Sequence, residues 1–290
     1  MVRKKTFAIL NVSMSTASAT VTIISTEGRE RLQQFLKDLW VYRELFWTFV
    51  QRDIKVRYKQ TALGIIWVVL QPLLMSGAFA LIFGKIARMP TDGLPMLLFY
   101  FAATVPWNTF ASAVTQSALS MEVNAGLITK IYFPRVIIPG AIVFGSFLDF
   151  AIGWTLLNAL ALWMGHWHWQ VLAMTLLLLL VQSCTALGVG LALGALNAQY
   201  RDVKHAVPFL MQILMLATPV IYPASRLPEI VQRLLFLNPM AGVVTAYRSL
   251  LETGAIDTTL VLNSLVISVV ALIAGFWFFR KCESRLADIL

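Results

Sequence analysis

Six long apolar runs, separated by short polar segments, dominate the pattern of the chain. They cover about residues 62–86, 94–116, 136–163, 171–196, 206–222 and 259–279. Most of them approach or exceed the roughly 18–20 residues with which an α-helix crosses the bilayer core. The pattern therefore predicts an all-α integral membrane protein with six transmembrane helices, in a domain that covers residues 61–282.

The stretch between the fifth and sixth runs is only moderately apolar. It holds two short helical patterns, 224–236 and 241–252, which are split by Asn238-Pro239. Each is too short to cross a core about 30 Å thick. We therefore expect residues 224–252 to form a re-entrant or surface pair of short outer helices.

Residues 35–60 precede the first run and have a helical period. One face is apolar and carries Leu39, Tyr42, Phe46, Phe49 and Val50. The opposite face is polar and carries Lys37, Glu44, Gln51, Arg52, Lys55 and Lys59. This pattern is typical of an amphipathic helix in the headgroup layer, with Trp40 and Trp47 as anchors. A soluble surface helix is the alternative.

The two ends of the chain are expected to lie outside the membrane. Residues 1–34 are rich in Ser and Thr without a sustained period, and we interpret them as a flexible cytoplasmic lead. Residues 283–290 follow the basic end of the last run and are interpreted as a cytoplasmic tail.

Two of the runs carry packing signals. Pro72 lies inside the first run, where it predicts a kink. Ala186, Gly190 and Gly194 recur every four residues in the fourth run. Small residues at this spacing let two helix backbones approach closely, so this face is expected to pack against another span.

Composition and charge agree with a membrane protein. The chain is 59% hydrophobic and 13% charged, whereas about 25% charged residues are usual in soluble domains. The net charge of +9 does not indicate nucleic acid, because the basic residues gather before residue 60 and in short loops. With both termini inside, 18 of the 23 Lys and Arg residues lie in cytoplasmic segments, which predicts that orientation.

Motifs for catalysis and for cofactors are missing from the sequence. The Gly84-Lys85 pair is followed by Ile, so no nucleotide-binding loop G-x-x-x-x-G-K-[ST] is present. His166 and His168 have no carboxylate or cysteine near them in sequence, so a metal site is not expected. We predict a protein that is not an enzyme and holds no catalytic residue, cofactor or metal.

Asp149 is an acidic residue in the middle of the third run. A carboxylate at this depth is costly unless it faces the interior of the bundle. Two interpretations remain open: a structural hydrogen-bond anchor for a neighbouring span, or a group on a substrate path or gate.

An ordered series of motifs carries a resemblance to a known family. Residues 124–135 read N-x-x-L-I-x-K-x-x-F-P-R, in a polar interruption between the second and third runs. Arg201-Asp202 follows in the next inner loop. Later come Pro219 to Tyr222, Leu227-Pro228, Asn238-Pro239 and Tyr247-Arg248. Over about residues 35–285 this series resembles the membrane subunit of type 2 ABC exporters for polysaccharides, such as Wzm-like O-antigen, capsule and teichoic acid permeases.

The resemblance implies a mechanism and partners. Permeases of this family form a homodimer docked on two ATPase subunits, which hold ATP and magnesium, in the bacterial inner membrane. Residues 120–135 would then be the coupling helix, with Asn124, Leu127, Ile128, Lys130, Phe133, Pro134 and Arg135 in contact with the ATPase. The outer helices would form a gate that includes Pro228, Asn238, Pro239 and Arg248.

The same resemblance implies a glycan on a polyprenyl diphosphate carrier as the substrate. Aromatic rings that could line its channel are Trp67, Phe79, Phe101, Trp107, Phe110 and Tyr222. The alternatives are an ABC permease for a small lipophilic drug or lipid, and an integral-membrane transferase. The transferase would need a polar catalytic cluster, and the sequence shows none.

Overall fold

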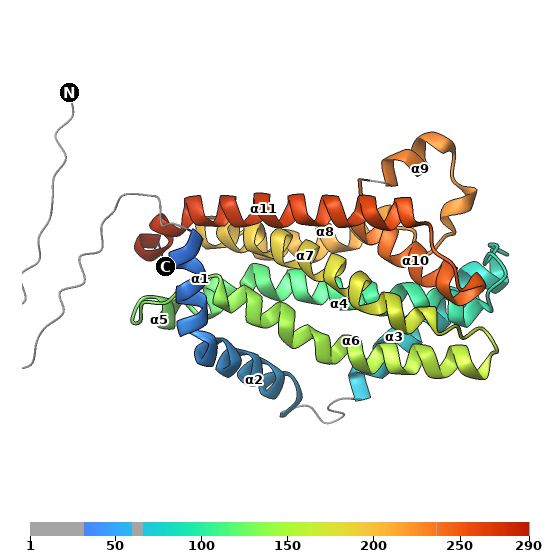
Figure 1. Cartoon of the computed structure of the whole chain (residues 1–290), viewed down its shortest axis with the longest axis horizontal. Helices are drawn as coiled ribbons and strands as arrows, with labels where there is room; N and C mark the ends of the chain where they lie inside the picture. The colour runs from blue at the N-terminus through green and yellow to red at the C-terminus, as the bar shows by residue number, and fades with distance from the viewer. Residues whose placement is uncertain (1–31, 60–65, 236, 290) are drawn as a thin grey trace, which may run out of the picture.

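The computed structural model describes residues 32–59, 66–235 and 237–289. Within these ranges the regular elements are all helices, as the sequence predicts (Figure 1). They are α1 (Leu32–Val41), α2 (Arg43–Lys59), α3 (Ile66–Phe79), the π-helix η1 (Ala80–Ile86), α4 (Met96–Val123), α5 (Ala125–Ile128), α6 (Ile137–Trp163), α7 (Gln170–Gln199), α8 (Val203–Ala217), the 3₁₀ turn η2 (Ala224–Arg226), α9 (Glu229–Leu235), α10 (Pro239–Thr253) and α11 (Thr258–Ile289).

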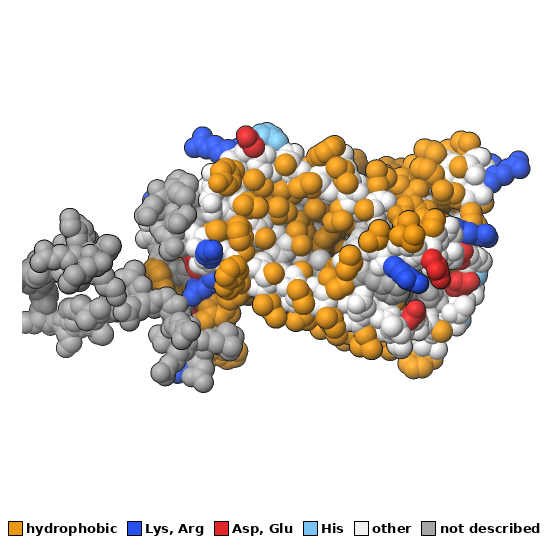
Figure 2. All heavy atoms as spheres, turned by 90° about the horizontal axis from the view of Figure 1, so that it is seen from above, with side chains coloured by type: hydrophobic (Ala, Val, Ile, Leu, Met, Phe, Trp, Pro, Cys, Tyr) orange, Lys and Arg blue, Asp and Glu red, His pale blue; other side chains and the backbone are white. Residues whose placement is uncertain are grey.

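Five of the helices are long and apolar enough to cross a membrane. They are α3 with η1, α4, α6, α7 and α11. The bent pair α9 and α10 would raise the number to six, and α8 is a shorter apolar helix. Figure 2 shows hydrophobic side chains across the middle of one face and charged side chains toward its two ends. The chain is therefore a multi-pass membrane protein.

The bundle has two distinct ends. One end holds α1, α5 and the carboxyl end of α11, and is called the α5 end below (Figure 1). The other holds α9 and the adjacent part of α10, and is called the α9 end. The residues of the predicted amino-terminal lead, 1–34, lie mostly outside the described residues. The predicted tail is helical as far as Ile289, because α11 continues past the last apolar turn.

α4 is the central helix of the bundle. It packs against α7, α6, α3, α8 and α10, and most of its side chains are buried. The sequence predicted that this span ends at residue 116, but the helix continues to Val123. Ser117, Ala118 and Met121 are buried in this extension, so packing against α7 maintains the helix where the hydropathy falls.

The small-residue face of α7 lies against α4, as predicted. A Cβ atom added to Gly190 would lie 2.6 Å from Ser117 Cβ, and one on Gly194 would lie 3.1 Å from Ser117 O. A second close contact was not predicted. Gly188 faces α11, where a Cβ would lie 2.5 Å from Ala271 O. α7 therefore has close contacts with two helices on different faces.

The amphipathic segment forms two helices, α1 and α2, with a turn at Tyr42. The predicted faces are confirmed: Phe49 and Val50 are buried, whereas the predicted polar face is exposed. α2 packs against α6. Trp40 and Trp47 are exposed, which suits side chains that anchor a helix at a membrane surface.

Candidate functional site

The polar segment after α4 is a short compact loop and not one continuous helix. α4 ends at Val123, α5 forms a single turn, and residues 129–136 are irregular. The Asn124 side chain donates a hydrogen bond to Ser120 O at 2.8 Å, so it closes the last turn of α4. The predicted coupling helix over 120–135 is thus wrong in its secondary structure, because Asn124 and Pro134 each interrupt the helical backbone.

Most of the motif residues in this segment anchor it to the bundle. Ile128 and Phe133 are buried in a cluster at the α5 end, where the Phe133 ring lies 5.9 Å from the Phe49 ring. Arg135 Nη1 donates to Glu283 O on α11 at 2.6 Å. Pro134 is also buried, and Leu127 is half-buried. These contacts hold the loop against α2 and α11.

The residues between the anchors are exposed. Lys130, Ile131 and Tyr132 lie at the surface, and Tyr132 is 67% exposed. The Tyr42 hydroxyl donates to Tyr132 O at 3.1 Å, which ties the tip of the loop to the turn between α1 and α2. We call Lys130, Ile131 and Tyr132 the coupling tip. It offers one charge and two large apolar side chains on a fixed backbone.

A second loop lies beside the coupling segment. Arg201 and Asp202 are exposed in the turn between α7 and α8, as predicted for this loop. The contacts to the coupling segment come from their neighbours: Lys204 Nζ lies 2.9 Å from Glu122 Oε1, and Asn197 Nδ2 donates to Glu122 Oε2 at 3.2 Å. The sequence analysis did not single out this role of Glu122, although a lone acid in a basic segment is a signal for an ion pair.

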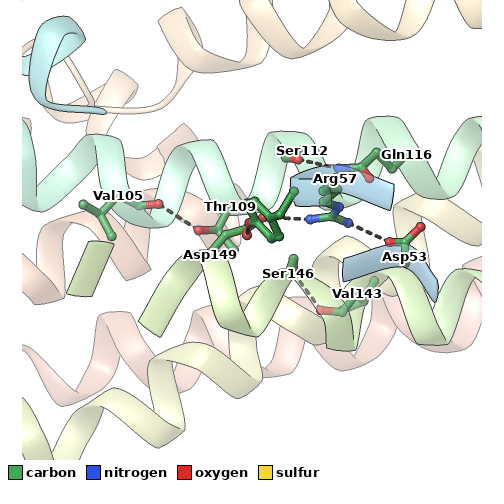
Figure 3. A network of polar contacts seen from close by, with 10 residues as sticks. Asp53, Arg57, Val105, Thr109, Ser112, Gln116, Val143, Ser146 and Asp149 are labelled. Atoms are coloured by element: carbon green, nitrogen blue, oxygen red, sulfur yellow. Dashed lines mark hydrogen bonds and ion pairs between the residues drawn. The ribbon is translucent and has the colours of Figure 1, made fainter. Parts of the chain in front are cut away.

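Asp149 takes part in an ion-pair network between α2 and α6. Arg57 Nη1 lies 2.7 Å from Asp149 Oδ2, and Arg57 Nη2 lies 2.9 Å from Asp53 Oδ2 (Figure 3). The Tyr58 hydroxyl also donates to Asp149 Oδ1. Burial, and next the hydrogen bond to Asp149, raise the pKa of Tyr58, so its hydroxyl keeps its proton. These contacts fit the structural alternative for Asp149.

The predicted fifth span is broken at the α9 end. The sequence predicted a helix over 206–222, but α8 ends at Ala217, and Thr218 has extended backbone with ψ of 142°. Pro219 explains the difference, since a proline disfavours helical backbone in the residue before it and has no N–H to donate. Residues 218–223 therefore leave carbonyl groups without helical partners.

Arg248 supplies hydrogen bonds to these carbonyl groups. It lies on α10, and its Nη1 donates to Pro219 O at 2.5 Å and to Tyr222 O at 3.2 Å. Its Nη2 donates to Val220 O at 2.7 Å. Non-helical backbone at membrane depth is tolerated only where the protein satisfies it. The sequence suggested a gate residue here, and the structure shows a buried side chain that holds the broken end of α8.

Two of the other predicted gate residues lie at the same place. The Asn238 side chain accepts a hydrogen bond from Met240 N at 3.0 Å and donates to Thr218 Oγ1 at 2.8 Å. Pro239 is the buried first residue of α10. Pro228 is exposed just before α9 and is not part of this group. α10 itself is largely buried, so it is not a surface helix.

Comparison with known proteins identifies the family. The sequence profile of ABC-2 type transporters matches residues 44–251. The chain belongs to the ABC-2 type transporter family. The resemblance read from the ordered motifs is thereby confirmed at the level of the family.

Three relatives cover most of the chain. It is 29% identical over 258 residues to the O-antigen export system permease protein RfbA of Myxococcus xanthus, covering 88% of this chain and 98% of that protein. It is 27% identical to the RfbA permease of Klebsiella pneumoniae, covering 85% and 95%. It is 26% identical to the polysialic acid transport protein KpsM of Escherichia coli, covering 81% and 92%.

The aromatic residues suggested for a channel lie in two environments in this ABC-2 type transporter. Phe79, Phe101, Trp107 and Phe110 are buried in the core of the single chain. A channel along the surface of α4 cannot reach them, because α4 is covered by other helices on nearly every side. Trp67 is exposed and Tyr222 is half-buried. Only these two of the six rings are placed where a substrate could contact them in this conformation.

Proposed function

We propose that this chain is the permease subunit of an ATP-driven exporter that moves a lipid-linked polysaccharide out of the cytoplasm across the inner membrane. The observation that carries the proposal is the coupling tip. Its three exposed side chains stand on a loop that α2, α4 and α11 hold in place. Such a loop suits a contact that must transmit force without deforming.

The substrate class is supported by the relatives. Three proteins named for O-antigen export or polysialic acid transport align with this chain over 92–98% of their own length. No large part of those permeases lacks a counterpart here. A glycan is therefore the substrate that we assign to this chain, and a polyprenyl diphosphate lipid is the carrier that we assign to the glycan.

The proposed orientation places the α5 end in the cytoplasm, with both termini inside. The basic residues before residue 60 and those of the two loops at this end support it. The energy source is a separate ATPase pair that binds ATP and magnesium, and the permease supplies the membrane path. Under this proposal the permease subunit is not itself an enzyme.

A homodimer completes the proposal. α3, η1 and α8 expose large apolar side chains, among them Leu74, Leu81, Phe209 and Leu216. In a dimer these faces would meet the second copy or flank the glycan path. Cysteine cross-linking between copies at Leu74 and at Phe209 tests this, in a background without Cys184 and Cys282.

The experiment that tests the function is complementation. The chain is produced with its ATPase partner in a strain that makes the glycan but lacks its permease. The expected result is glycan at the cell surface, lost when either subunit is omitted. Glycan that stays in the cytoplasm while a lipid or drug is moved would overturn the proposal in favour of the small-molecule alternative.

A further inference from the structure

A hollow lined by both polar and apolar side chains opens between α3, α4 and α6, in the membrane-spanning part of the chain. Its volume is about 170 Å³. The polar and aromatic side chains of its lining are Trp67, Gln71, Asn108, Thr109, Ser112 and Asp149. Asn108 and Thr109 lie near the midpoint of α4, and Figure 3 shows Thr109, Ser112 and Asp149 in one close-up.

Two amide side chains line the hollow. Neither Gln71 nor Asn108 makes a hydrogen bond to any group in the part of the chain that the structure describes. An amide without partners is costly to move from water into an apolar medium. Gln71 is exposed and Asn108 is half-buried, so both amides are accessible to water or to a polar ligand in the hollow.

The charged side chains at and near the hollow exclude an anionic ligand. Arg57 is the cation near the hollow, and its two terminal nitrogens are already bound to Asp53 and Asp149. Arg57, Asp53 and Asp149 together carry a net charge of −1. The described residues that line the hollow include no Lys or Arg. A phosphate would thus meet a carboxylate whose neighbouring cation, Arg57, is already paired with two carboxylates. A ligand that donates hydrogen bonds suits Asp149, and one that also accepts them suits the two amides.

The shape of the hollow further limits the class of ligand that it can bind. Trp67, 48% exposed, brings a flat aromatic ring to the lining of the hollow. A sugar ring has apolar C–H faces that pack on an aromatic ring and hydroxyl edges that both donate and accept. The hollow is smaller than the roughly 300–1,000 Å³ of sites for drug-sized ligands. It suits one ring and not a longer segment of a chain.

We propose that this hollow is a binding subsite for one neutral pyranose ring of the exported glycan. Gln71 and Asn108 bind ring hydroxyls, Asp149 accepts from a third hydroxyl, and Trp67 packs on the ring face. Arg57 positions the Asp149 carboxylate and does not contact the sugar. The inference rests on the proposed function and adds where along the path the sugar is recognised.

Binding is tested with the full-length permease in its complex with the ATPase, in nanodiscs. The probes are the methyl pyranosides of glucose, galactose, mannose and rhamnose, observed by saturation-transfer difference NMR. We expect the ring-proton signal of at least one pyranoside to fall about tenfold in Gln71→Leu/Asn108→Leu, since two hydrogen bonds to the sugar are lost. Gln182→Leu is the matched control, because Gln182 is a buried amide on α7 outside the hollow. Its signal should equal that of the unmodified chain.

Three outcomes would overturn the subsite. One is that, for every pyranoside, the double variant gives the same saturation-transfer signal as the unmodified chain. Another is that glycerophosphoethanolamine or inorganic phosphate gives that signal instead, which would assign the hollow to a lipid headgroup or an anion. The third is that cysteines at Gln71 and Asn108 cross-link to a second copy, which would mean that the hollow is filled in a dimer. If the double variant does not fold, Asn108→Ser and Gln71→Ala are measured singly.

An export assay separates failure of the subsite from failure of the proposed function. Surface glycan is measured in the complemented strain for the unmodified chain, the double variant and Gln182→Leu. Export that falls about tenfold only in the double variant supports the subsite, as the binding loss above predicts. Normal export by the double variant overturns the subsite and leaves the proposed function intact. No export by the unmodified chain overturns the proposed function itself, whatever the binding result.

Discussion

The guanidinium of Arg248 lies over the ring of Phe99, with 3.5 Å between the guanidinium carbon and the ring centroid. Its Nε also donates to Phe99 O at 3.1 Å. One side chain of α10 is thus fixed on α4 while its two terminal nitrogens bind the loop after α8. This arrangement links three helices at the α9 end through a single residue.

Arg248→Ala is expected to destabilise the protein strongly. The carbonyl groups of Pro219 and Val220 would lose their donor, and each buried unsatisfied carbonyl costs about 1–3 kcal/mol. Thermal unfolding in detergent measures the effect. Arg233→Ala is the control, because Arg233 is an exposed residue whose pair with Glu229 is worth about 0–1 kcal/mol. Equal melting temperatures for the two variants would contradict the assigned role.

Lys130→Glu and Tyr132→Ala are expected to uncouple ATP hydrolysis from glycan export. The two side chains are exposed at the coupling tip, and the loop below them is held by buried anchors. The variants should therefore fold normally and lose export by about tenfold or more, the effect of losing about 1.4 kcal/mol at the contact. Lys55→Glu, an exposed charge reversal on α2, is the control. Normal export by both tip variants would contradict the proposal that the coupling tip contacts the ATPase.

Asp149 and Arg57 are expected to be energetically coupled. A double-mutant cycle with Asp149→Asn and Arg57→Gln should give an interaction energy of about 0.5–3 kcal/mol, as found for residues in one ion-pair network. Hydrogen exchange of α2 amides should rise in either single variant, because the ion pair holds α2 on α6. Additive effects with unchanged exchange would show that the network does not hold α2.

Gly188→Ala and Gly77→Ala are expected to change the stability of the protein in opposite directions. A Cβ on Gly188 would lie 2.5 Å from Ala271 O, so α7 and α11 must separate. A Cβ on Gly77 meets nothing within 4 Å, so alanine there gains about 0.5–1 kcal/mol of helix stability. Melting temperatures measure both. A Gly188 variant as stable as the Gly77 variant would mean that the contact between α7 and α11 is looser than described.

The sequence was sufficient for the features that depend on local periodicity. The amphipathic faces of α2, the small-residue face of α7 and five of the long spans follow from spacing alone. The break of α8 had a signal in Pro219, but the run of apolar residues concealed it. The end of α4 could not be predicted, because residues 117–123 stay helical through packing on Gly190 and Gly194.

The candidate site could likewise be predicted from the sequence only in part. The order of the motifs singled out residues 120–135, whereas their division into buried anchors and an exposed tip depends on tertiary contacts. Phe101 and Trp107 seemed suited to a channel because they are aromatic, but α4 lies at the centre of the bundle and buries them. The contacts of Arg248 join residues almost 150 positions apart and had no local signal.

α8 is fastened to α4 at both of its ends. Near its start Lys204 is paired with Glu122, and past its end Arg248 joins the loop at Pro219 to Phe99. Sliding of α8 along α4 must therefore break at least one of these two contacts. If the passage opens by moving α8, either α4 moves with it as one body or one of the two contacts breaks first.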